Sequence, residues 1–168
     1  MDLCVPHNCH GGSPDARGLH SFVCKRAPGG SARHHALNDL VVRSFASVGV
    51  PVTKEPAGLF RSDGKRPDGV SLVPCWQSGK SLCWDVTVTC PLAESYVDRA
   101  SHQAGAAAEL AATRKEDKYV YLGAHYIFEP IAIETLGVFN ASARHLLADL
   151  GRMISINTGE ARETSFLF

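Results

Sequence analysis

Residues 65–89, KRPDGVSLVPCWQSGKSLCWDVTVT, decide the fold. Two segments of strand character, residues 65–73 and 81–89, flank a stretch of turn-forming residues at 74–79. The second segment alternates, as a half-buried strand does, with apolar side chains at Leu82, Trp84, Val86 and Val88. If residues 74–79 form the connection of a hairpin, its centre lies at position 76.5. Opposed residues of the antiparallel ladder then have numbers that sum to 153.

This register predicts that two carboxylates face each other, because 68 and 85 sum to 153 and both positions hold aspartate. Opposed side chains lie ~4.5–5.5 Å apart, and like charges at that spacing destabilise a sheet. A hard divalent cation prefers carboxylate oxygens and would offset the repulsion. We therefore predict a cation site at Asp68 and Asp85. The alternative is a shifted turn, with Asp68 only capping a strand edge.

The segments on either side of the hairpin complete an α/β pattern. Apolar residues at helical spacing predict a helix over 34–48, which Gly49 and Pro51 end. Further along, the predicted elements are a weak strand at 51–60, an alanine-rich helix at 104–118, strand character at 119–137 interrupted by Pro130, and a last helix at 141–156 with Ser142 as its N-cap. The order α-β-β-β-α-β-α predicts a mixed sheet of about four strands, its first three forming a meander, with helices flanking it.

The first 33 residues have neither a strand nor a helix period, and they are rich in glycine and proline. They hold four residues of the types that bind tetrahedral zinc, namely Cys4, Cys9, His20 and Cys24, with His7 and His10 as alternative ligands. A structural Zn²⁺ would order a segment that has little core of its own. We expect a Cys/His-rich segment at 1–33 and a separate domain at 34–168. The alternative is a disordered stretch with free thiols.

Composition narrows the class of protein. With 168 residues, of which 45% are hydrophobic, the chain is expected to form about one globular domain. It has no uncharged apolar run long enough for a membrane helix, and its first residues do not form a secretory signal. The net charge is zero, but residues 1–66 carry nine basic and five acidic side chains, or +4. A basic front half would suit a polyanionic partner; the alternative is random scatter of charge.

These residues also resemble a known family. Pro67-Asp68, followed by a strand bearing Asp85-Val-Thr87, resembles the PD-(D/E)xK motif of restriction-endonuclease-like nucleases. The wider set is similar to the C-terminal endonuclease region of non-LTR retrotransposon polyproteins, and consists of residues 18–20 (GLH), Cys24, 33–34 (RH), 37–39 (LND), 63–69 (DGKRPDG), 84–87 (WDVT) and 133–137 (IETLG). The resemblance spans roughly residues 9–168. The Cys/His-rich segment likewise resembles the zinc knuckle of these proteins.

The resemblance implies a restriction-endonuclease-like core that hydrolyses DNA phosphodiester bonds, with Asp68 and Asp85 holding Mg²⁺ or Mn²⁺. The family motif ends in a lysine two residues after the second acid, and this sequence has Thr87 there. In the retrotransposon branch the lysine lies on the following helix in a KxxKY-like pattern, which matches residues 115–119 (KEDKY). Lys115 and Lys118 are therefore both catalytic candidates. Glu55 is either a third carboxylate of the site or a surface residue.

The same resemblance implies the partners. DNA is the expected substrate, with RNA reached through a parent polyprotein, and the expected location is inside the cell, in the nucleus. The basic residues near the acidic pair are the candidates for the DNA backbone, above all Arg33, His34, Lys65 and Arg66. Two alternatives stay open: a catalytically inactive nucleic-acid-binding remnant, which Thr87 favours, and a purely structural remnant of a mobile element.

Overall fold

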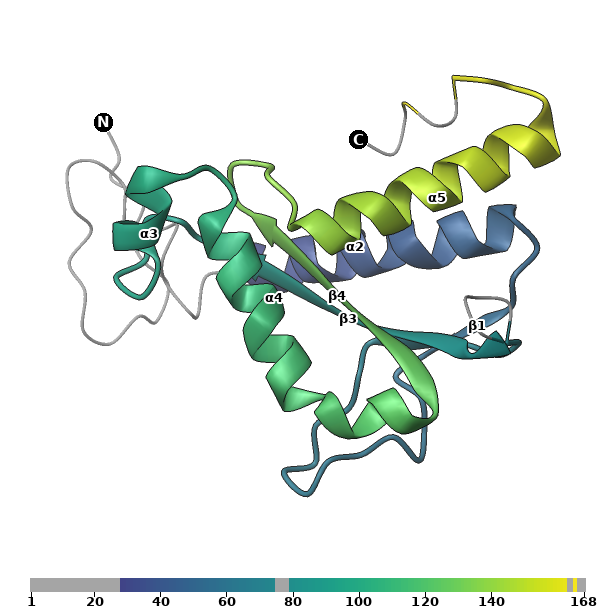
Figure 1. Cartoon of the computed structure of the whole chain (residues 1–168), viewed down its shortest axis with the longest axis horizontal. Helices are drawn as coiled ribbons and strands as arrows, with labels where there is room; N and C mark the ends of the chain where they lie inside the picture. Colours follow the sequence, from purple (N-terminus) through teal and green to yellow (C-terminus); the bar gives the residue numbers. More distant parts are fainter. Residues whose placement is uncertain (1–27, 75–78, 163–164, 166–168) are drawn as a thin grey trace.

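The computed structural model describes residues 28–74, 79–162 and 165 of the chain (Figure 1). The predicted zinc ligands Cys4, Cys9, His20 and Cys24 lie outside the described residues. Within the described part, no helix combines the length and apolar character needed to cross a membrane.

A four-stranded mixed sheet forms the centre of the molecule. Its strands follow one another in chain order and comprise β1 (Val52–Lys54), β2 (Gly69–Ser71), β3 (Ser81–Thr89) and β4 (Tyr126–Glu134). The first three are antiparallel neighbours, whereas β4 runs parallel to β3. The predicted α/β class, mixed sheet and three-strand meander are confirmed.

The hairpin register agrees with the sequence arithmetic. Gly69 pairs with Trp84 and Val70 pairs with Cys83, and the numbers of both pairs sum to 153. Strand β2, at Gly69–Ser71, is much shorter than the strand predicted at residues 65–73. Pro67 has no N–H to contribute to a ladder, which explains why regular pairing does not extend toward residue 65. Asp68 therefore lies just before the strand, within reach of β3 but outside the regular ladder.

Helices cover both faces of the sheet (Figure 1). On one face, α2 (Pro28–Ser47) and α5 (Ala141–Thr158) pack on β3 and β4. On the other face lies α4 (Ala106–Lys118). In the chain, α4 follows the short α3 (Val97–His102) and precedes the 3₁₀ helix η2 (Val120–Ala124). The first helix begins earlier than the predicted residue 34, and α3 was not predicted. Small alanine side chains on α4 let that helix approach the sheet at Ala132.

The core on the α2 side is built around Trp84. This side chain is fully buried, and its ring stacks on Phe45 with centroids 5.2 Å apart and an interplanar angle of 18°. The indole Nε1–H donates to Asn38 Oδ1 at 2.9 Å, which satisfies the one polar group of the ring. The indole also lies against Gly69, where an added Cβ would come within 2.0 Å of Trp84 Cζ2.

We expect Gly69→Ala to lower the free energy of unfolding by about 2–3 kcal/mol, because the methyl group forces either the buried indole or the β2 backbone to shift. Urea denaturation followed by tryptophan fluorescence measures the change. Gly123→Ala is the matched control, since a Cβ there has no heavy atom within 4 Å. Equal stability of the Gly69→Ala and Gly123→Ala variants would contradict the packing described here.

The region predicted as one interrupted strand, 119–137, divides into η2 and β4, and Pro130 lies inside β4. Proline is tolerated because β4 is an edge strand. Asn140 replaces the missing neighbour: its Oδ1 accepts from Ala132 N at 2.8 Å and its Nδ2 donates to Pro130 O at 3.1 Å. The predicted N-cap Ser142 is wrong, because α5 begins at Ala141, directly after Asn140.

Candidate active site

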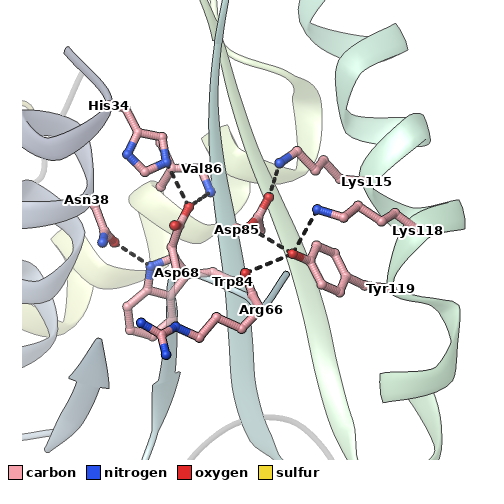
Figure 2. Close-up of polar contacts among 10 residues, drawn as sticks. All are labelled: His34, Asn38, Arg66, Asp68, Trp84, Asp85, Val86, Lys115, Lys118 and Tyr119. Carbon is pink, nitrogen blue, oxygen red and sulfur yellow. Dashed lines mark hydrogen bonds and ion pairs between the residues drawn. The ribbon is translucent and has the colours of Figure 1, made fainter. Parts of the chain in front are cut away.

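Asp68, the residue just before β2, is held by contacts with α2 and β3 (Figure 2). Its backbone N–H donates to Trp84 O at 3.0 Å, which ties residue 68 to β3. Its Oδ2 accepts from Val86 N at 2.7 Å and lies 3.0 Å from His34 Nε2 of α2. None of the described residues donates a hydrogen bond to Oδ1 of Asp68. One oxygen thus orients the carboxylate, and the other is available to a ligand.

Asp85 lies in the middle of β3 and is only 4% exposed. Its Oδ2 forms an ion pair with the ammonium group of Lys115, which reaches over from α4. Its Oδ1 lies 3.3 Å from the hydroxyl of Tyr119. Figure 2 shows Asp68 approached by side chains of α2 and Asp85 approached by side chains at the end of α4. The two helix layers thus meet the sheet at the two acids.

Tyr119 connects the second acid to its surroundings. Its hydroxyl oxygen accepts from Lys118 Nζ at 3.1 Å. Its single proton is shared between Arg66 O at 2.9 Å and Asp85 Oδ1 at 3.3 Å. The ring itself is buried against Phe128, with centroids 4.8 Å apart. Packing therefore holds the hydroxyl in place between β3 and the segment that leads to Asp68.

The electrostatics agree with this geometry. Burial raises the pKa of Asp85, the Lys115 ammonium opposes that rise, and the negative charge of Asp68 adds to it. The hydrogen bond to Asp68 raises the pKa of His34. Burial, followed by repulsion from Lys115, lowers the pKa of Lys118. The negative charge of Asp68 thus disfavours ionisation of Asp85, and a cation bound to both would offset that repulsion.

The donor set fits a hard divalent ion better than a soft one. Mg²⁺ binds to proteins through one or two carboxylates and keeps several of its waters. Across residues 28–74 and 79–162, no group of three or more His, Cys, Asp and Glu side chains is placed to hold a metal. Asp68 and Asp85 alone would leave most of the coordination sphere to water and substrate, which suits Mg²⁺ or Mn²⁺ and not a tetrahedral zinc site.

The structure separates the two candidate lysines. Lys115 is bound to Asp85, whereas Lys118 donates to Tyr119 and lies over its ring. Thr87 follows Asp85 on β3, and its hydroxyl is buried with no hydrogen-bond partner in the described part of the chain. The ammonium group therefore reaches the second acid from α4 and not from β3.

Comparison with known protein families and with curated proteins finds no match for this chain. The family resemblance accordingly rests on the quoted residues alone. What the structure itself shows is the α/β sheet, the contact of His34 with Asp68 and the ion pair of Lys115 with Asp85.

The four predicted DNA-binding residues have different surroundings. His34 contacts Asp68 and belongs to the site. Arg33 precedes it on α2 and is exposed, as is Lys65 in the turn before Asp68. Arg66 pairs with Glu55, while its carbonyl accepts from Tyr119. The Glu55 side chain is 58% exposed and bound to Arg66, which corresponds to the surface alternative for this residue.

Two positioning residues were not assigned from the sequence, although helical spacing points to both. Asn38 lies four residues after His34, and Tyr119 lies four residues after Lys115, so each shares a helix face with a candidate site residue. Asn38 is also a polar residue in the buried stripe of α2, where it needs a partner and finds the indole of Trp84. A search for polar residues at i+4 from each candidate would have found them.

Proposed function

We propose that this chain is a metal-dependent endonuclease domain that hydrolyses DNA phosphodiester bonds, similar to the endonuclease region of non-LTR retrotransposon polyproteins. One observation carries the proposal: Asp68, just before β2, accepts from Val86 N of β3, directly after the buried Asp85, and the Lys115 ammonium group is paired with Asp85. Two carboxylates with an ammonium group beside them provide the charges that phosphodiester hydrolysis needs.

Each residue has a distinct part in this proposal. Asp68, oriented by His34 and Val86 N, and Asp85, held in β3, would be the ligands of the cation. When bound, Mg²⁺ or Mn²⁺ polarises the phosphate and lowers the pKa of a bound water. Lys115 opposes the rise that burial causes in the pKa of Asp85, and its charge would offset the negative charge that develops on the phosphate.

The surroundings support a nucleic-acid substrate. Arg33 and Lys65 are exposed and lie close in sequence to His34 and Asp68, so their charges are accessible to a nucleic-acid backbone. Such contacts position a duplex without reading its sequence. Binding of RNA through a larger polyprotein, a location in the nucleus and a zinc site at Cys4, Cys9, His20 and Cys24 belong to the same proposal, and they rest on the resemblance.

The test is nicking of supercoiled plasmid by the full chain. We expect conversion to the open-circular form in Mg²⁺ or Mn²⁺. We expect none in EDTA or in buffer without added metal, because the acids alone cannot activate water. Gel retention of the same DNA is measured in parallel. Retention without cleavage in either metal would replace the proposal by the second candidate, a nucleic-acid-binding domain without catalysis. The neutral Thr87 at the usual lysine position is the observation that favours that candidate.

A further inference from the structure

An open pocket of about 250 Å³ is lined by Phe60, Arg61, Ser62 and Tyr121. It is formed by the loop between β1 and β2 on one side and by η2 on the other. The Phe60 side chain is 53% exposed and that of Tyr121 is 44% exposed. Neither ring belongs to the hydrophobic core clusters of the described residues, and both line the pocket.

Cationic side chains lie beside aromatic rings at the pocket. The Arg66 guanidinium lies over the Phe60 ring, 5.4 Å from its centroid, and the Arg61 guanidinium lies 6.0 Å from the centroid of Tyr119. Lys65 is exposed between them in the sequence. Arg61 and Arg66 pair with Asp63 and Glu55, and with Asp68 the loop of residues 55–68 carries three cations and three anions.

Contacts through Lys118 and Tyr119 link the pocket to Asp85. Arg61 donates to the carbonyl of Lys118, and the hydroxyl of Tyr119 bridges Arg66 O and Asp85 Oδ1. The Tyr121 hydroxyl donates to Leu59 O at 3.3 Å, which holds η2 against the loop. The pocket and Asp85 are therefore linked through Tyr119, whose ring centroid lies 6.0 Å from the Arg61 guanidinium and whose hydroxyl lies 3.3 Å from Asp85 Oδ1.

We propose that this pocket binds one unpaired nucleobase of the DNA substrate, stacked on Phe60 beside Tyr121, with the flanking phosphates near Arg61 and Lys65. The inference rests on the proposed function and names its substrate class: DNA with an unpaired nucleotide next to the cleaved bond. Exposed aromatic rings beside cations are the pattern of single-strand binding sites. The volume is below the ~300–1,000 Å³ of sites for drug-sized ligands, which favours a single base.

The test measures binding in EDTA, so that it needs neither metal nor cleavage. Fluorescence anisotropy compares a single-stranded oligonucleotide with the duplex of the same sequence. We expect tighter binding of the single strand, because duplex bases are already stacked. We further expect Phe60→Ala to weaken single-strand binding by between about 5- and 100-fold. Tyr96→Ala is the matched control, since Tyr96 also lies under a guanidinium, that of Arg114, but outside the pocket.

A second measurement does not depend on variants. An oligonucleotide containing 2-aminopurine is expected to lose fluorescence on binding to the wild type, because the base stacks, and to keep it on binding to Phe60→Ala. Equal binding of single strand and duplex, or a Phe60→Ala variant that binds and quenches like Tyr96→Ala, would overturn the inference. Plasmid nicking in Mg²⁺ separates the two proposals. Nicking without Phe60-dependent stacking would support the endonuclease function and refute base binding in the pocket. Stacking without nicking would support base binding and refute the endonuclease function.

Discussion

Replacing Asp85 with asparagine is expected to reduce Mg²⁺-dependent nicking by at least about a thousandfold. A bound metal contributes several kcal/mol to the stabilisation of transition-state charge, and each ~1.4 kcal/mol corresponds to a factor of ten in rate. Asparagine keeps the shape of the side chain and an oxygen for Tyr119, but it removes the charge that would bind the cation. Asp68→Asn is expected to act in the same direction, because it removes the other carboxylate.

The measurement is the initial rate of plasmid nicking over a Mg²⁺ titration, with circular dichroism to verify that each variant is folded. Asp149→Asn is the matched control: its carboxylate also pairs with a basic side chain, Arg152, but on the surface of α5. We expect this control to nick at the wild-type rate. If either Asp85→Asn or Asp68→Asn, once folded, cleaves as fast as the control, the two acids are not metal ligands.

Lys115→Gln is expected to lower the nicking rate by about 100- to 1,000-fold, the usual loss when one positioned donor to a developing charge is removed. Lys118→Gln is expected to cost less than about tenfold, because its ammonium group contacts Tyr119 and not an acid. Glutamine is preferred to alanine at Lys115, since it retains a hydrogen-bond donor beside the buried Asp85.

Single-turnover rates at saturating Mn²⁺ make the comparison sharp, because they separate the chemical step from weaker metal binding. Lys115→Arg serves as the conservative variant and is expected to recover part of the rate, since it restores the positive charge. A larger loss for Lys118→Gln than for Lys115→Gln would mean that the assignment of the two lysines is reversed.

Several features of this protein follow from local sequence alone. A hairpin is a local structure, and the residues that form its turn also set which positions face each other. Centring the turn between residues 74 and 79 was therefore enough to predict the pairs Gly69–Trp84 and Val70–Cys83. The extent of β3 and the existence of the three long helices follow in the same way, because each depends on a periodicity of neighbouring residues.

Other features depend on residues far apart in the chain. The short length of β2 and the edge position of the strand that contains Pro130 both depend on how the strands pair. Asn140 bonds to β4 and precedes the first residue of α5, so Ser142 is not the N-cap of that helix. The choice between Lys115 and Lys118 is of the same kind. Both lie on one face of α4, so helical spacing cannot separate them. Which lysine reaches Asp85 depends on where α4 crosses the sheet. Close packing of the α4 alanines on Ala132 sets that position.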